Sequence, residues 1–282
     1  MAQRVPELVA LNLQLEACTP SRFPHGAGFW AYAAILRLME SFDPVAAAEA
    51  HGGPASDKRA LVTVSGVLKD SCSPLDTVEL EPGESAHLRI ATVGPRAVAA
   101  LARSLELCRR PLVLELGPYP VHVVGVEPAE TASQNPASLD DLYERAMATR
   151  GPICMRFLSP TTFERRRLWY ALPAPEAVFG RPGPRPSGLF RHFVMLRQPE
   201  PPCLDPSHVG AVMRWIEPCI ARLALDGGVQ WTARAFRGEC EYVAPPEETA
   251  RLHILGLLAE YTGVGQRVSF GMGQVRVSFP IS

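Results

Sequence analysis

Seven histidines are spread through the chain, and two of them, His51 and His25, stand where acid–base chemistry could be done. Histidine titrates near neutral pH and can therefore give or take a proton there. His51 closes an expected helix, and Lys58 and Arg59 follow it closely and could supply a cation for developing negative charge. The alternative is that His51 is only a helix-end histidine that the helix dipole stabilises.

His25 is the competing candidate. It precedes the first expected helix, in the segment RFPHGAGF, and a helix start favours the neutral imidazole. Tyr32 is one of few polar groups on that helix and could help to orient a bound phosphate. The remaining histidines have no acidic or basic partner pattern and are predicted to be structural; they are His87, His122, His192, His208 and His253.

A glycine-rich segment, TGVGQRVSFGMGQVRV at residues 262–277, lies between an expected helix and the last expected strand. Glycines at this spacing let a backbone approach a ligand closely and direct N–H groups at an anion. The order helix, loop, strand does not fit a dinucleotide-binding loop, and no Gly-Lys-Ser/Thr is present for a P-loop. The alternative is a turn without a ligand. The candidate binding residues in this loop are Gly263, Gly265, Arg267, Ser269, Gly271 and Gly273.

Arginine supplies almost all of the basic charge, because only Lys58 and Lys69 among the 28 basic residues are lysines. Arginine forms bidentate contacts with phosphates, although codon bias would give the same composition. The run Arg165, Arg166 and Arg167 is a candidate phosphate-binding segment, although a charge run is also typical of a solvated face. Further candidates for phosphate contacts are Arg181, Arg185, Arg191 and Arg276.

The first half of the chain contains the elements that must position these residues. Strict alternation over residues 9–16 predicts a half-buried strand, and the apolar run at 29–42 predicts a buried helix. Asp43-Pro44 starts a second, short helix that His51 ends. Two strands at 61–67 and 86–92 that could pair, a helix from Gly94-Pro95 and a strand at 119–127 follow. The order β-α-β-β-α-β predicts a ferredoxin-like unit.

The second half repeats this order loosely. A helix at 139–149 and a strand at 152–158 are expected first, followed by a loop at 173–187. A helix at 206–225, which Pro218 should kink, leads to hairpin strands at 229–236 and 239–244 that turn at Arg237-Gly238. A helix at 246–260 and a strand at 274–279 complete the unit. The predicted fold class is α+β, with two tandem ferredoxin-like (RRM-like) βαββαβ domains. We expect the domains at 1–127 and 139–282, with a linker at 128–138.

Composition narrows the class of protein. With 282 residues, 47% of them hydrophobic and 20% charged, the chain can bury two cores. No apolar run approaches the roughly 18–20 residues of a membrane span, and no secretory signal is evident, so we expect a cytoplasmic protein with no membrane partner. Seven scattered cysteines form no CxxC pair, so neither a disulfide framework nor a metal site is indicated. The four tryptophans are too dispersed to predict a stacking platform.

Four features together resemble the RAMP-type CRISPR repeat-processing endoribonucleases. They are the GxGxxxSxGxG loop, the tandem βαββαβ order, the segment RFLSPTTFE at 156–164 and the segment DPVAAAEAHGGPASDKRALVTVSGVL at 43–68. The resemblance implies an enzyme that uses no cofactor and no metal. Such an enzyme cuts CRISPR repeat RNA (pre-crRNA) into guide RNAs and leaves a 2',3'-cyclic phosphate and a 5'-hydroxyl.

The resemblance also implies roles for single residues. His51 falls where the family has its general acid/base histidine and Lys58 where it has a helper lysine, whereas the family's tyrosine position falls at Leu36 rather than Tyr32. A non-catalytic RAMP subunit that holds crRNA beside other CRISPR effector subunits is one alternative. A small-molecule enzyme with the same fold is a second alternative, because the net charge of −1 does not by itself indicate a nucleic-acid partner.

Overall fold

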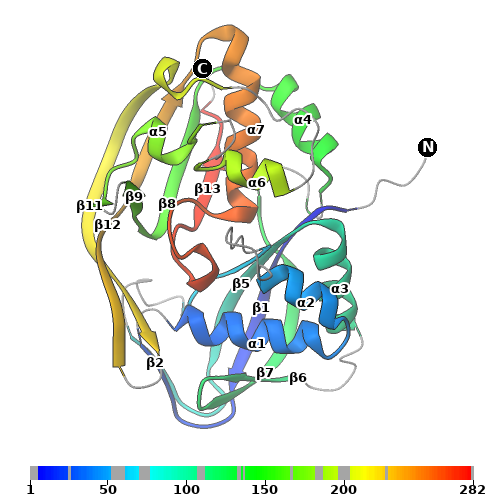
Figure 1. Ribbon diagram of the computed structural model, residues 1–282. Coiled ribbons are helices and arrows are strands. Elements are labelled where there is room, and N and C mark those ends of the chain that lie inside the picture. Colours follow the sequence, from blue (N-terminus) through cyan, green and yellow to red (C-terminus); the bar gives the residue numbers. More distant parts are fainter. Residues whose placement is uncertain are drawn as a thin grey trace, which may run out of the picture.

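The computed structural model describes residues 6–24, 27–51, 61–69, 77–106, 112–131, 135, 137–165, 168–181, 187–195, 204–225 and 228–280. Its first half forms a five-stranded antiparallel sheet with the order β3-β5-β1-β7-β6. The strands are β1 (Leu8–Ala17), β3 (Val62–Val64), β5 (Ser85–Val93), β6 (Leu112–Leu116) and β7 (Tyr119–Pro128). Helices α1 (Gly28–Glu40), α2 (Pro44–His51) and α3 (Pro95–Glu106) lie together on one side of this sheet (Figure 1). A small separate sheet pairs β2 (Ser21–Phe23) with β4 (Val78–Leu80).

The second half forms a four-stranded antiparallel sheet with the order β11-β12-β8-β13. The strands are β8 (Ile153–Thr161), β11 (Gly210–Leu225), β12 (Gly228–Val243) and β13 (Val275–Ser278). Helix α7 (Pro246–Thr262) packs on this sheet beside α4 (Leu139–Ala148), as Figure 1 shows. Between β8 and β11 lie the paired strands β9 (Phe163–Arg165) and β10 (Leu168–Tyr170), the short helices α5 (Pro175–Val178) and α6 (Phe190–Met195), and the 3₁₀ turn η1 (Pro206–His208).

The two sheets share one strand order. If the four strands of each βαββαβ unit are numbered along the chain, their order across the sheet is second, third, first and fourth. This order is β3-β5-β1-β7 in the first sheet and β11-β12-β8-β13 in the second. This is the ferredoxin-like arrangement, so the predicted α+β fold class with two tandem ferredoxin-like units is confirmed. The strands at 61–67 and 86–92 do pair, with Val62 opposite Thr92. The limits of the two domains and the linker at 128–138 remain predictions.

Local packing explains why α2 begins where it does. The side chain of Asp43 accepts the N–H of Ala46 at 2.9 Å, which caps the first turn of α2. Arg96 of α3 donates to both oxygens of the same carboxylate at 3.2 Å. These bonds, that of the Ala46 backbone most strongly, lower the pKa of Asp43. Helix α2 is therefore fixed at its start, and His51 is carried at its other end.

The helix expected at 206–225 is wrong, because residues 210–225 form the long strand β11. Its apolar residues recur at intervals that also suit a helix, and this spacing misled the prediction. Pro218 fits the strand because β11 lies at the edge of its sheet, where a missing N–H leaves no neighbouring strand unpaired. The loop expected at 173–187 contains the single helical turn α5.

The hairpin turn expected at Arg237-Gly238 is also wrong. Strand β12 runs through both residues without a break, and the hairpin partners are β11 and β12 themselves. The register of β12 against β8 shifts between Phe236 and Gly238. A Cβ at Gly238 would lie 2.5 Å from the carbonyl oxygen of Trp215. Gly238 therefore allows a close backbone approach at a bulge rather than a turn.

The long helices of this fold are amphipathic or buried in the protein. Among the residues that the structure describes, no helix is both long enough and apolar enough to cross a membrane.

Two main apolar cores correspond to the two sheets, and the larger one also takes in Leu8, Ala10 and Ala91 from the first sheet. The two units are thus packed against each other.

Candidate active site

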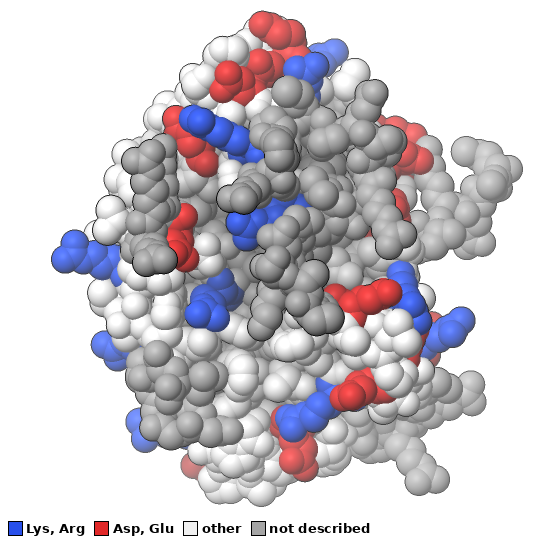
Figure 2. All heavy atoms as spheres, viewed as in Figure 1, with Lys and Arg blue, Asp and Glu red and all other residues white. Residues whose placement is uncertain are grey.

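A cleft of about 700 Å³ lies between the two units. The first unit contributes Tyr32 of α1 and His51 of α2 to its lining. The second unit contributes residues of β9, β10, α5 and α6 together with the loop at 263–270. Figure 2 shows Lys and Arg side chains near the middle of the face that is in view.

His51 and Tyr32 are the polar side chains that the first unit contributes to the lining of the cleft. The hydroxyl of Tyr32 lies 3.4 Å from Nδ1 of His51 and 3.5 Å from the carbonyl oxygen of Ala50. Burial raises the pKa of Tyr32 to about 12, so its phenol stays protonated at neutral pH. The hydroxyl donates to the Ala50 carbonyl, and it can accept a hydrogen bond from Nδ1 of His51 or donate one to it, according to the tautomer of the imidazole. Tyr32 is therefore placed to orient His51, which is itself exposed.

The glycine-rich loop follows α7 and folds back on itself. The N–H of Val264 donates to Gly273 O at 2.8 Å, and the N–H of Gly273 donates to Pro160 O at 3.0 Å. The N–H groups of Gly263 and Gly271 also donate within the protein, to Ala259 and Val268. Three of the four glycine N–H groups are thus engaged internally, which limits how many of them can meet an anion.

Gly271 shows what this loop needs from glycine. Its φ is +92°, and a Cβ there would lie 2.8 Å from the backbone nitrogen of Gly66 in the first unit. A side chain at this position would push the loop away from the segment that follows β3. The glycine therefore has a structural role at the junction between the units, whatever the loop binds.

Hydrogen bonds fasten the loop to the first sheet. Arg89 of β5 donates to the side-chain oxygen of Gln274 at 3.0 Å and to the carbonyl of Glu260 at 2.6 Å. Gln274 donates to Val64 O at 3.3 Å, and Thr63 donates to Tyr261 O at 3.1 Å. Burial lowers the pKa of Arg89. These contacts fix the position of the second unit's loop relative to the first unit's histidine.

Aromatic rings complete the contact between loop and helices. The ring of Phe270, in the 3₁₀ turn η2 (Val268–Phe270), lies 5.4 Å from the rings of both Tyr32 and Phe29. Arg267, which precedes this turn, has φ +59°, and its guanidinium lies over the rings of Phe270 and Trp231. A non-glycine residue in this conformation carries strain of a kind that clusters at functional sites.

The charged side chains at the cleft are mostly basic. Arg181, Arg191 and Arg267 line it, together with Glu164 and Glu176. His192, which the sequence suggested to be structural, also lines it. Arginine is suited to bidentate contacts with phosphate oxygens, so this wall can hold an anionic chain. Among the described residues, no group of three or more His, Cys, Asp and Glu side chains could hold a metal ion.

The structure brings part of the predicted site together. His51, Tyr32, Gly263, Gly265, Arg267 and Ser269 all line the cleft, although more than 200 residues separate His51 from the loop. Gly271 and Gly273 lie in the same loop, at its return. The other predicted site residues fall outside what the structure describes: His25, Lys58, Arg59, Arg166 and Arg167 entirely, and Arg165 in its side chain.

Sequence reasoning missed the aromatic side of the cleft. Trp169 and Tyr170 line it, and the ring of Trp169 lies 5.1 Å from that of Trp231. The two tryptophans come from β10 and β12, and no pattern in the sequence indicates that these strands meet. The adjacent aromatics in the segment LWY, directly after the arginine run, were the available signal.

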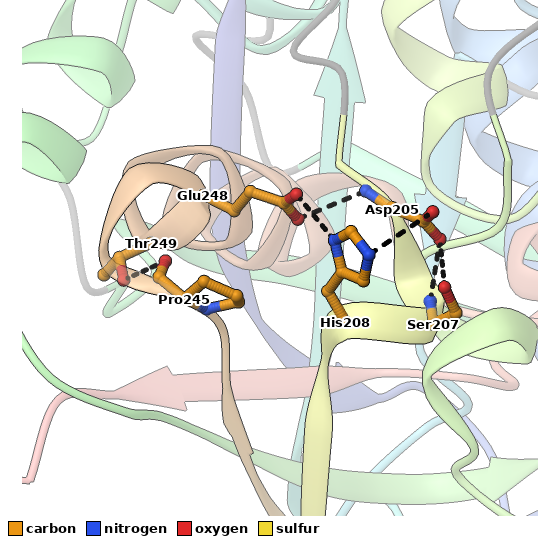
Figure 3. Close-up of polar contacts among 6 residues, drawn as sticks. All are labelled: Asp205, Ser207, His208, Pro245, Glu248 and Thr249. Atoms are coloured by element: carbon orange, nitrogen blue, oxygen red, sulfur yellow. Dashed lines mark hydrogen bonds and ion pairs between the residues drawn. The ribbon is translucent and has the colours of Figure 1, made fainter.

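A second polar cluster lies at the start of α7 (Figure 3). His208 contacts Glu248 at 3.0 Å and Asp205 at 3.9 Å, so the prediction that this histidine has no acidic partner is wrong. The hydrogen bond to Glu248, followed by the charge of Asp205, raises the pKa of His208. None of these residues lines the cleft. The cluster ties η1 to the first turn of α7.

Comparisons with solved structures show which known proteins share this fold. A Cas6 product complex, 20% identical, aligns with a TM-score of 0.68 over 97% of this chain and 100% of the other. Thermus thermophilus Cas6, 18% identical, aligns with a TM-score of 0.61 over 98% and 100%. A RAMP protein described as binding different RNA substrates, 15% identical, aligns with a TM-score of 0.58 over 95% and 99%. The fold is thus that of RAMP proteins with tandem ferredoxin-like units.

The sequence of the second unit is similar to one protein family. Residues 155–275 match the model of the family described as CRISPR-associated endoribonuclease Cas6. The match includes the glycine-rich loop and ends in β13, whereas His51 lies outside it. No curated protein matches the sequence. Residues 155–275 are thus similar in sequence to the Cas6 endoribonucleases, and the whole chain is similar in fold to Cas6 and other RAMP proteins.

Proposed function

We propose that this protein cleaves CRISPR repeat RNA without a metal ion and leaves a 2',3'-cyclic phosphate and a 5'-hydroxyl. The observation that carries the proposal is the pairing, in one cleft, of His51 with arginines that suit phosphate contacts. The Cas6 family match supports RNA as the substrate. The structures with a similar fold include a RAMP protein described as binding different RNA substrates, which supports the same class of ligand.

The proposed reaction is a transesterification at phosphorus. The ribose 2'-oxygen attacks the adjacent phosphorus and loses its proton to a base, so a bond from O2' to phosphorus forms. The bond from phosphorus to O5' breaks, and the leaving oxygen takes a proton from an acid. His51 serves as one of these two groups. His25, Lys58 and Arg59 remain candidates for the other, since they neighbour the described site in sequence.

Two further roles follow from the cleft. Tyr32 acts as a positioning residue, because its protonated hydroxyl lies against Nδ1 of His51. Arg267, with Arg181 and Arg191, stabilises the negative charge that builds on the phosphate oxygens. The loop residues Gly263, Gly265, Ser269, Gly271 and Gly273 and the run Arg165, Arg166 and Arg167 remain proposed RNA contacts.

The test is incubation with cognate repeat RNA in excess EDTA, with His51→Ala as the matched variant. We expect the wild type to cut once per repeat and the variant to bind the RNA but cut it far more slowly. Tight binding without any cut, with or without Mg²⁺, would instead support a non-catalytic RAMP subunit that holds crRNA. Cleavage that appears only with Mg²⁺ would contradict the proposed mechanism.

A further inference from the structure

Two exposed aromatic side chains flank the cleft on the side of the second unit. Trp169 and Tyr170 are adjacent in β10, are 41% and 40% exposed, and both line the cleft. Large aromatic side chains that lie next to each other at this exposure leave apolar surface in contact with water. Their position beside arginines, rather than in a core, suggests that they meet a ligand.

Trp231 holds Trp169 in place from β12. The two indole rings meet edge to face, with centroids 5.1 Å apart and planes at 79°. Trp231 is itself only partly exposed, because it packs against a small apolar cluster of Ala221, Leu223, Ala235 and Met272. Trp169 is therefore supported by a ring that the sheet anchors, so little entropy is lost when a ligand contacts it.

Arg267 adds a cation to the same surface. Its guanidinium carbon lies 5.7 Å from the centre of the Trp231 ring and 6.0 Å from that of Phe270. Phe270 in turn contacts Tyr32, whose hydroxyl lies against His51. A continuous series of contacts thus joins the tryptophan pair to the proposed catalytic histidine.

We infer that Trp169, Trp231 and Arg267 form a stacking platform for one unpaired base of the repeat RNA, close to the bond that is cut. The inference rests on the proposed function, because it assigns a base-binding subsite to the same cleft. A flat aromatic ring beside a guanidinium suits a nucleobase joined to a phosphate, since the ring stacks on the base while the cation meets the backbone. Such a site needs an unstacked base, so it selects RNA that is single-stranded at this nucleotide.

Binding to a set of repeat RNAs with a single abasic nucleotide at each position in turn tests the platform. Each RNA also carries a 2'-deoxy sugar at the cleavage site, so that dissociation constants are measured without cleavage. We expect one abasic position to weaken binding to the wild type by about fivefold to a hundredfold. Trp169→Ala should weaken binding to intact RNA by a similar factor and should no longer respond to that abasic position.

Trp215→Ala is the matched control. Trp215 is 42% exposed, as much as Trp169, but lies on the edge strand β11 and does not line the cleft. Its loss should leave both the affinity and the abasic profile of the wild type unchanged. An equal loss of affinity in both variants, or an abasic response that persists in Trp169→Ala, would overturn the platform.

A second measurement needs no variant. Repeat RNAs with a single 5-iodouridine, irradiated on the wild-type protein, should crosslink from the abasic-sensitive position to a peptide that contains Trp169, Tyr170 or Trp231. Crosslinks from that position only to other peptides would overturn the platform while leaving the proposed cleavage intact. Failure of the wild type to bind repeat RNA at all would contradict both the platform and the proposed function.

Discussion

The two βαββαβ units share a strand order but differ in what connects their first two strands. In the first unit, helices α1 and α2 fill this connection and end at His51. In the second unit, the short elements β9, β10, α5 and α6 take the place of a long helix. Among the described residues of this connection no long helix covers the cleft, and Trp169 and Tyr170 of β10 are exposed at its edge.

The two units therefore contribute different groups to the proposed active site. The first unit supplies the proposed proton-transfer group, whereas the second supplies the loop, the aromatic rings and the arginines that would hold RNA. Each unit alone would lack part of the site. The junction through Arg89 and Gln274 is therefore as important to the proposed activity as the residues that meet the substrate.

The first unit's proposed role is tested by replacing its histidine. We expect His51→Ala to slow single-turnover cleavage by about 10²–10⁴, the usual contribution of a general acid or base. Affinity for the RNA should stay within a few fold, because the second unit is unchanged. A larger effect in His25→Ala would move the proposed catalytic group to the start of α1.

Tyr32→Phe separates positioning from catalysis. The variant keeps the ring that packs against Phe270 and removes only the hydroxyl that lies against His51. We expect a smaller loss of rate than in His51→Ala, with the affinity for RNA unchanged, because the hydroxyl orients the imidazole and does not transfer the proton. An unchanged rate, or a loss as large as that in His51→Ala, would contradict this role.

The junction is tested by removing its buried cation. Arg89→Met deprives Gln274 and the Glu260 carbonyl of their donor, and a hydrogen bond to a charged group contributes about 1.5–3 kcal/mol. We expect a loss of that size in the free energy of unfolding, measured in urea, and slower cleavage. The control Arg96→Met removes ion pairs of an exposed arginine within the first unit, where solvent screens the charges, and should cost clearly less. Equal losses of unfolding free energy in the two variants would contradict a particular role of Arg89 in joining the units.

The close approach of the units is tested at Gly271. Gly271→Ala adds a Cβ 2.8 Å from Gly66 N, at a φ of +92°. Gly94→Ala is the control, because its φ of +97° is equally unfavourable but a Cβ there meets nothing within 4 Å. We expect Gly94→Ala to cost about 1–2 kcal/mol from the backbone alone. Gly271→Ala should cost about 1–3 kcal/mol more from the clash and should also weaken RNA binding.

The smallest expected effect is confined to the second unit, at His208. Its carboxylate partners raise the pKa of His208 above 6.5 in the folded state, so its stabilising contribution is present below that pH and is lost as the pH rises through the folded pKa. The melting temperature of the wild type should exceed that of His208→Asn in mildly acidic buffer and match it in mildly alkaline buffer. A difference that does not change with pH would contradict a charged His208.

Strong local patterns allowed the first unit to be predicted well. Alternation in β1, the apolar run of α1 and the Asp43-Pro44 helix start each have one local explanation, and the structure has these elements. In the second unit, the apolar spacing of β11 suits both a helix and a strand, and only its pairing with β12 decides between them. Strands β2, β4 and β6 were not predicted, because they are short.

The site was predictable only in part. The residues of the glycine-rich loop stand out by their spacing, and His51 stands out by its helix end, but nothing local indicates that they share a cleft. The contact between Trp169 and Trp231 depends on how β10 lies against β12, which is a property of tertiary packing and leaves no periodic signal.

The proposed reaction depends on attack of the RNA's own 2'-hydroxyl on the adjacent phosphorus. The most direct measurement is cleavage of repeat RNA in EDTA, with and without one 2'-deoxy sugar at the cleavage site, followed by analysis of the product ends. We expect one cut per repeat with a 2',3'-cyclic phosphate and a 5'-hydroxyl, and no cut in the deoxy RNA. Cleavage of the deoxy RNA, or products that carry a 5'-phosphate, would contradict it.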